Sequence, residues 1–237
     1  MSRLALVNSE LNNKTKSALA AMGYECIQLP QADFLPYPMS THPDMLVFSG
    51  FGKLFTHRKY YEKNKELIDS IISSSSLSLV ISHEDIAEKY PHDVIFNCAL
   101  VGNKLICNPK YVSKHILCEA QKSNITVIFV KQGYVKCSVC IVDESSVITS
   151  DVGIYNAVTA HGIDCLLICS GSISLPPYEY GFIGGASGSD DKNVYFCGDI
   201  SKHPDGDRIR KFITSKNKSA VCLDENTLFD FGSILFL

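Results

Sequence analysis

The sequence predicts an α/β fold in which five repeated units close into a ring. Segments recur in the order strand, strand, helix, strand with a period of roughly 43 to 52 residues, which is typical of repeat architectures. The chain has 237 residues, enough for one large closed domain. Its last eight residues, DFGSILFL (230–237), form an apolar β-type run. Such a run exposes an unpaired edge unless another strand pairs with it, which favours closure of the ring.

The clearest unit spans residues 93–130. It opens with DVIFNCALVGNKLICN, a hairpin that turns at a Gly-Asn pair. Asn108 and Pro109 then predict a helix start, since Asn is a common N-cap and Pro a common first helical residue. The strand ITVIFV completes the unit. The same order recurs at residues 44–82, 136–170 and 180–225.

The fifth unit is divided between the two ends of the chain. The N-terminal segment supplies the strand LALVN, a helix and a further strand, but lacks the first strand of a hairpin. The C-terminal run can supply it by pairing with LALVN. We therefore predict a single domain, 1–237, of five repeats with these approximate bounds: 1–30 plus 228–237, 44–82, 93–130, 136–170 and 180–225. An open doubly wound sheet remains the alternative, although no glycine-rich fingerprint follows LALVN.

Composition excludes several classes of partner. The net charge is -3 with scattered basic residues, so neither a nucleic acid nor a membrane surface is expected as partner. No apolar run approaches the roughly 18 residues of a spanning helix. The N-terminus turns polar within about eight residues, too soon for a signal peptide. We expect a cytoplasmic protein whose ten cysteines are reduced thiols.

Five ββαβ units closed by the two chain ends resemble the pentein fold, an α/β propeller. This fold is that of the guanidino-group-modifying enzymes: arginine deiminases, amidinotransferases and dimethylarginine hydrolases. The phrases HPDMLVF, FNCALVGNKLICN and KQGYVKCS are similar to a compact bacterial subgroup without an assigned activity. The resemblance implies an axial pocket for a small molecule, with hydrolase or transferase activity on a guanidino or amino compound. A non-catalytic binding module remains the alternative, because a ribosome anti-association factor shares the fold.

The resemblance also implies catalytic roles that this sequence leaves unfilled. The enzymes use a cysteine in the final strand, a histidine in the fourth unit and carboxylates in earlier units. Leu235 stands at the cysteine position, and no histidine lies near Tyr134 to Lys136. Asp44 matches the acidic residue of the first complete hairpin, but Ser49-Gly50 replaces a second one. The usual Cys-His pair is therefore predicted to be missing.

Polar residues in the predicted hairpins are the candidate ligand-binding residues. Asp44, Asp93 and Asp230 align at corresponding places, which favours either an acidic rim for a cation or ordinary turn residues. Asn97 interrupts an apolar strand, so its side chain requires hydrogen bonds to the backbone or to a ligand. Gly185, in the loop GGASGSDD, is expected to approach the axis and leave room there.

Cys137 is the candidate catalytic residue. Lys136 precedes it, and a neighbouring cation lowers the pKa of a thiol, so Lys136 is also counted among the ligand-binding residues. The alternative is a buried thiol on a strand face shared with positions 139 and 141. Cys137 and Cys140 have C-x-x-C spacing, but residues three apart on a strand point to opposite faces. We therefore expect no metal site and no cofactor.

Overall fold

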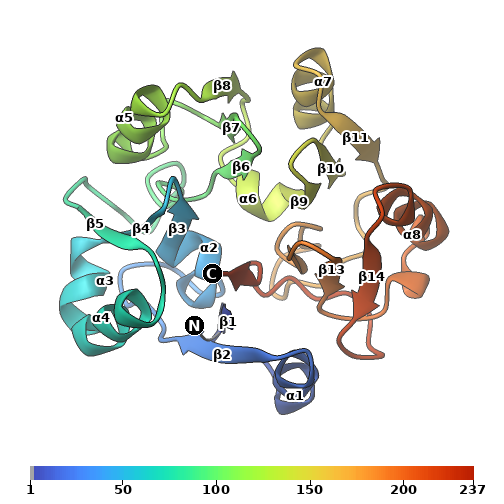
Figure 1. Cartoon of the computed structure of the whole chain (residues 1–237), viewed down its shortest axis with the longest axis horizontal. Coiled ribbons are helices and arrows are strands. Elements are labelled where there is room, and N and C mark those ends of the chain that lie inside the picture. Colours follow the sequence, from blue (N-terminus) through green and yellow to red (C-terminus); the bar gives the residue numbers. More distant parts are fainter. Residues whose placement is uncertain (1–2) are drawn as a thin grey trace.

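Five three-stranded sheets follow one another around a central axis in the computed structural model, which describes residues 3–237 (Figure 1). The middle strand of each sheet pairs antiparallel with one neighbour and parallel with the other. The helices that connect each middle strand to its parallel neighbour lie on the outside of the ring (Figure 1). This arrangement confirms the predicted α/β fold of five ββαβ units.

The two ends of the chain close the ring. Strand β15 (Leu235–Phe236) pairs antiparallel with β1 (Arg3–Asn8), with Ala5 opposite Phe236 and Leu6 opposite Leu235. Helix α1 (Asn13–Ala21) then leads to β2 (Tyr24–Leu29), which pairs in parallel with β1. The predicted pairing of the terminal strands is confirmed.

The other four units repeat this order with closely similar elements. The second consists of β3 (Val47–Gly50), β4 (Lys53–His57), α3 (Arg58–Lys63), α4 (Lys65–Ser74) and β5 (Ser78–Ser82). The third consists of β6 (Ala99–Val101), β7 (Lys104–Cys107), α5 (Lys114–Lys122) and β8 (Thr126–Phe129). The fourth consists of β9 (Val139–Asp143), β10 (Ser146–Thr149), α7 (Val152–Ala160) and β11 (Asp164–Leu167). The fifth consists of β12 (Ser187–Ser189), β13 (Asn193–Phe196), the 3₁₀ helix η2 (Ile200–Lys202), α8 (Gly206–Ser215) and β14 (Ser219–Cys222).

The outer helices follow from apolar residues at helical spacing. Helix α5 buries Ile116 and Ala120, and α8 buries Ile209 and Ile213, in each case four residues apart on one face. These apolar faces cover the sheets. Around the axis, neighbouring sheets contact one another through their first strands: β12 contacts β9 and β15, and β6 contacts β9. Among the described residues, no helix combines the length and the apolar character needed to cross a membrane.

One predicted helix boundary is wrong. Helix α5 begins at Lys114 rather than at Pro109, and the Ser113 side chain accepts a hydrogen bond as its N-cap. The Asn108 side chain donates to the Lys131 carbonyl at 2.9 Å, just after β8 of the same unit, and its Oδ1 accepts the Lys110 N–H at 3.2 Å. Asn-Pro is a local signal for a helix start, and here a tertiary contact overrides it.

The strands nearest the axis are also shorter than predicted. One-turn helices, α2 (Pro43–Leu46) and α6 (Val135–Ser138), precede β3 and β9. Asp44 and Cys137 therefore lie on helical turns rather than on strands. The alternation argument used for Cys137 and Cys140 is wrong for this reason, since only Cys140 lies on a strand. Pro43 occupies the first position of α2, which suits a helical start.

Candidate functional site

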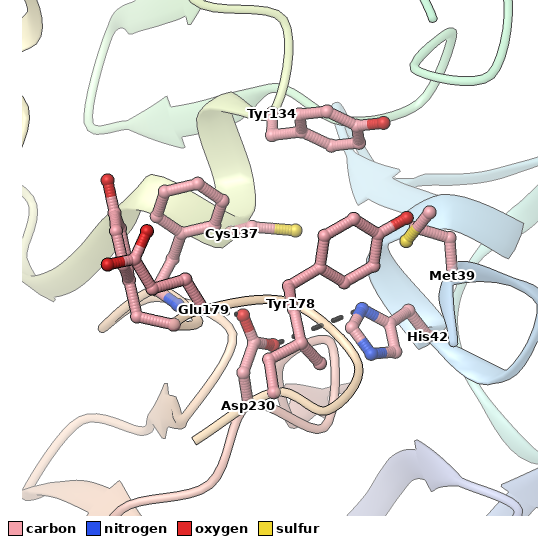
Figure 2. A pocket seen from close by; sticks show the side chains of 10 residues that line it. Met39, His42, Tyr134, Cys137, Tyr178, Glu179 and Asp230 are labelled. Carbon is pink, nitrogen blue, oxygen red and sulfur yellow. Dashed lines mark hydrogen bonds and ion pairs between the residues drawn. The ribbon is translucent and has the colours of Figure 1, made fainter. Parts of the chain in front are cut away.

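A cavity of about 290 Å³ is lined by residues from different units of the ring (Figure 2). Its walls come from four places far apart in the sequence. These are the segment from the 3₁₀ helix η1 (Met39–Thr41) to α2, the start of α6, the loop between β11 and β12, and the segment before β15. The lining residues are Met39, His42, Tyr134, Cys137, Leu175, Tyr178, Glu179, Tyr180, Phe182 and Asp230. Only a closed ring brings these segments together.

Asp44 is a buried carboxylate beside the floor of this cavity. Its residue is 1% exposed. The Ser233 hydroxyl donates to Asp44 Oδ2 at 2.6 Å, and Lys136 Nζ donates to Ser233 Oγ at 2.9 Å. Burial raises the pKa of Asp44, although the charges of His42 and Lys136 oppose that rise. Asp44 and Lys136 also line a second, smaller cavity of about 70 Å³.

Cys137 is held between Asp44 and Asn97. Its Sγ lies 3.2 Å from Asp44 Oδ2 and 3.3 Å from Asp44 Oδ1, so the thiol can donate to this carboxylate. Asn97 Nδ2 approaches Sγ at 3.1 Å, and Asn97 Oδ1 accepts the backbone N–H of Cys137 at 3.2 Å. Asn97 thus fixes the position of α6 with both ends of its amide.

The expected activation of Cys137 by Lys136 does not agree with the structure. Burial, followed by the charges of Asp44 and Asp230, raises the pKa of the Cys137 thiol well above its usual range. Lys136 extends to Ser233 instead of toward the sulfur. The free thiol is therefore protonated at neutral pH and is a hydrogen-bond donor rather than a resting nucleophile.

Asp230 is the second buried carboxylate, 1% exposed, and it faces the cavity. The backbone N–H groups of Phe182 and Gly232 donate to its two oxygens, each at 2.9 Å. Burial raises its pKa to about 6, against the effect of these hydrogen bonds. A side chain at Gly185 would overlap this carboxylate. Gly185 therefore lies near the axis as expected, where its role is to make room for Asp230.

His42 lies beside Asp230 and was not predicted from the sequence. Its Nδ1 is 3.9 Å from Asp230 Oδ1 (Figure 2). Within residues 3–237 this nitrogen is buried and has no hydrogen-bond partner. Burial lowers the pKa of His42, so the ring is neutral at neutral pH. The donor atoms of His42, Asp44 and Cys137 all lie within 4.8 Å of one another.

The candidates from the sequence fall into two groups. In contact around the axis are Asp44, Asn97, Lys136, Cys137, Gly185 and Asp230. Asp93 is separate, because it accepts a hydrogen bond from the Tyr134 hydroxyl at 2.5 Å and does not line the cavity. The residues that the sequence analysis missed are His42 and the loop side chains Tyr178, Glu179 and Tyr180. His42 could have been found from the sequence His42-Pro43-Asp44, because it lies only two positions before the candidate Asp44.

Known structures with a similar fold include a DDAH, an amidinotransferase and an agmatine deiminase. A mutant of DDAH from Pseudomonas aeruginosa complexed with citrulline has a TM-score of 0.60 at 9% identity, covering 94% of this chain and 92% of that one. The amidinotransferase SxtG from Microseira wollei has a TM-score of 0.55 at 9% identity, covering 92% and 87%. Agmatine deiminase from C. jejuni has a TM-score of 0.51 at 10% identity, covering 85% and 70%.

The TM-scores establish a shared fold, the pentein fold that the repeats predict, and at 9–10% identity they assign no activity. No curated protein sequence matches the chain. The model of one protein family matches residues 6–235, and that family is described as a family of unknown function, DUF6873. The match covers nearly the whole chain, and the chain therefore belongs to this family and has the pentein fold.

Proposed function

We propose that the axial cavity binds a small organic cation with a guanidino, amidino or amino group. The observation that carries this proposal is a pair of buried carboxylates, Asp44 and Asp230, without a matching cation. Within residues 3–237, neither forms an ion pair with a lysine or an arginine. Lys136 reaches Asp44 only through Ser233. Buried charges in proteins are normally paired, so a bound cation would complete this site.

The free hydrogen-bonding capacity of the Asp230 carboxylate suits a planar cation. Each of its oxygens accepts one backbone N–H and keeps a further lone pair, so two parallel N–H groups of a guanidinium can bind. The volume of about 290 Å³ is at the lower end of ligand pockets, which span roughly 300–1,000 Å³. A ligand of the size of an amino acid is therefore favoured over a larger one.

Aromatic side chains support the same class of ligand. Tyr134, Tyr178, Tyr180 and Phe182 line the cavity. Figure 2 shows the rings of Tyr134 and Tyr178. An aromatic face attracts a cation by about 0.5–2 kcal/mol, with the higher value in desolvated sites. Tyr178 is 48% exposed, so part of its surface is accessible from the solvent. Glu179 adds a further carboxylate to the lining.

We propose that the protein binds its ligand without forming a covalent bond to Cys137. A protonated thiol bonded to a carboxylate is a poor nucleophile. The fold neighbours named above are a DDAH, an amidinotransferase and an agmatine deiminase, which supports a guanidino compound as ligand but not the same reaction. A partner protein in place of a small molecule would be indicated if no cation binds.

Calorimetric titration with arginine, agmatine and dimethylarginine, and with citrulline as the neutral analogue of similar shape, tests the proposal. We expect the cations to bind and citrulline to bind at least tenfold more weakly, because only a cation pairs with Asp230. Asp230→Asn should lose binding, and Glu179→Gln should weaken it without touching the hydrogen bonds that hold Asp230. Asp207→Asn, at an exposed carboxylate on α8, is the matched control and should bind as the wild type does. Equal affinity for citrulline, or unchanged binding in Asp230→Asn, would overturn the proposal.

A further inference from the structure

We propose that His42, Asp44 and Cys137 form a site for a divalent transition metal ion, with zinc the best match. The three residues are 2%, 1% and 3% exposed, and His42 and Cys137 line the floor of the axial cavity. They offer an imidazole nitrogen, a carboxylate oxygen and a thiol sulfur. These are the three protein donor types that bind zinc. The inference goes beyond cation binding and does not depend on it, because His42, Asp44 and Cys137 would hold the metal, whereas the organic cation would pair with Asp230.

The separations of the donor atoms fit one shared ion. With zinc-ligand bonds of about 2.0–2.3 Å, neighbouring ligands of a tetrahedral ion lie about 3.5 Å apart. Cys137 Sγ is 3.2 and 3.3 Å from the two oxygens of Asp44. All three donors lie within 4.8 Å of one another, so a small rotation of side chains brings His42 to bonding distance.

An independent observation is the unpaired nitrogen of His42. Its Nδ1 is buried, and it lacks a hydrogen-bond partner within the described residues, 3–237. A buried polar atom without a partner costs about 1–3 kcal/mol, so a ligand is expected to satisfy it. Figure 2 shows the imidazole of His42 and the sulfur of Cys137 both facing the cavity. A neutral imidazole is the commonest protein ligand for such metals.

Neighbouring hydrogen bonds orient two of the donors, as in known metal sites. Asn97 Nδ2 approaches the Cys137 sulfur at 3.1 Å, and the Ser233 hydroxyl holds Asp44 Oδ2 at 2.6 Å. Neither contact needs to break when an ion binds, because a thiolate and a carboxylate both accept several hydrogen bonds. The donors are therefore held in place by groups that remain compatible with the metal.

The proposal predicts that protons are released when the metal ion binds. Metal binding converts the Cys137 thiol into a thiolate, since a coordinating thiol loses its proton. The ion forms bonds to sulfur, nitrogen and oxygen, and the S–H proton leaves to solvent. One proton should therefore be released for each ion that binds. The ion also compensates the negative charges of the thiolate and of Asp44, for which no lysine or arginine ion pair exists among residues 3–237.

The first experiment is a titration of chelator-treated protein with zinc and with cobalt(II). We expect one ion per chain, release of about one proton measured in two buffers of different ionisation enthalpy, and visible cobalt bands of a four-coordinate site. A thiolate-to-cobalt charge-transfer band should accompany them. No uptake by the wild type, or uptake without this band and without proton release, would overturn the site.

Variants separate these donors from adventitious thiol binding. Cys137→Ser should abolish the charge-transfer band and weaken zinc binding by on the order of 100-fold or more. His42→Gln should weaken zinc binding while keeping that band. Cys140→Ser removes a buried thiol three positions away, and His203→Gln replaces another buried histidine, so both are matched controls expected to bind as the wild type. Unchanged binding in Cys137→Ser would refute the proposal, and circular dichroism checks that each variant is folded. If the wild type takes up the metal but binds none of the organic cations, the proposed function is refuted and the metal site is not.

Discussion

Deletion of residues 230–237 tests whether the ring depends on its closing strand. The deletion removes β15, which pairs with β1, and the backbone hydrogen bond from Leu237 to Leu4. It also removes Ile234, which is 3% exposed and packs in the core cluster beside β1. Strand β1 would then present an open edge of buried apolar residues.

The expected loss of stability is large compared with the stability of a domain. Truncating a buried isoleucine costs about 2–5 kcal/mol. The Phe236 ring lies 4.4 Å from that of Tyr24 and 5.1 Å from that of Tyr195, and each aromatic pair adds about 0.5–1.5 kcal/mol. Together with the other partly buried residues of the segment, the loss approaches the about 5–15 kcal/mol that stabilises a typical domain. We therefore expect no cooperative unfolding transition in the truncated chain.

Urea denaturation followed by far-ultraviolet circular dichroism measures the effect. Ile234→Ala serves as a graded version and should lower the free energy of unfolding by about 2–5 kcal/mol. Val152→Ala, at a side chain that is 58% exposed, is the control and should change it by less than about 0.5 kcal/mol. A truncated chain that unfolds cooperatively near the urea midpoint of the full chain would refute the role of β15.

Three further predictions concern single side chains. Gly185→Ala should destabilise the protein by about 1–3 kcal/mol in urea denaturation, because the added methyl overlaps the Asp230 carboxylate; an unchanged midpoint would contradict this. Asp190→Asn should cost about 1.5–3 kcal/mol at pH 7, since this carboxylate accepts hydrogen bonds from Tyr24 and from backbone N–H groups. Burial opposes its ionisation, but these hydrogen bonds outweigh burial and lower its pKa. The contribution is therefore present above the unfolded pKa of about 3.9 and lost as pH falls through the lower folded pKa, so the gap between variant and wild type should close in acid. Chelator-treated protein should react with iodoacetamide at exposed Cys118 well before Cys137, as mass spectrometry of digests would show, and early labelling of Cys137 would contradict its raised pKa.

The repeats were predictable because they depend on local signals. Alternating strands, turn residues and helical spacing recur in each unit, and the unpaired run at 230–237 pointed to its partner. The errors lie near the axis, where contacts between residues far apart in the sequence decide the local structure. Asn108 looks like a helix cap but bonds to Lys131, which follows β8 and is 23 positions away, and Cys137 looks like a strand residue but lies on a helical turn.

The clustering of the candidate residues was predictable from the sequence, but their contacts were not. Polar residues inside apolar runs, such as Asn97, mark groups that need partners, and the ring brings them to one place. The direction of Lys136 was not encoded locally, because its partner Ser233 is 97 positions away. The pairing of Cys137 with Asp44, 93 positions apart, likewise exists only in the closed ring. No spacing rule links such residues, so the sequence alone did not predict a metal site.

The closing strand also couples occupancy of the cavity to the dynamics of the chain ends. Asp230 and Ser233 belong to the same short segment as β15, so fraying of that strand would carry two site residues away from the axis. Any ligand that holds these residues opposes the fraying by mass action. Amide protons of β1 should then exchange more slowly with deuterium when the cavity is filled, and the protection should scale with ligand concentration. Pairing of the terminal strands thus keeps the binding site assembled, and the amide exchange rates of these strands report whether the site is occupied.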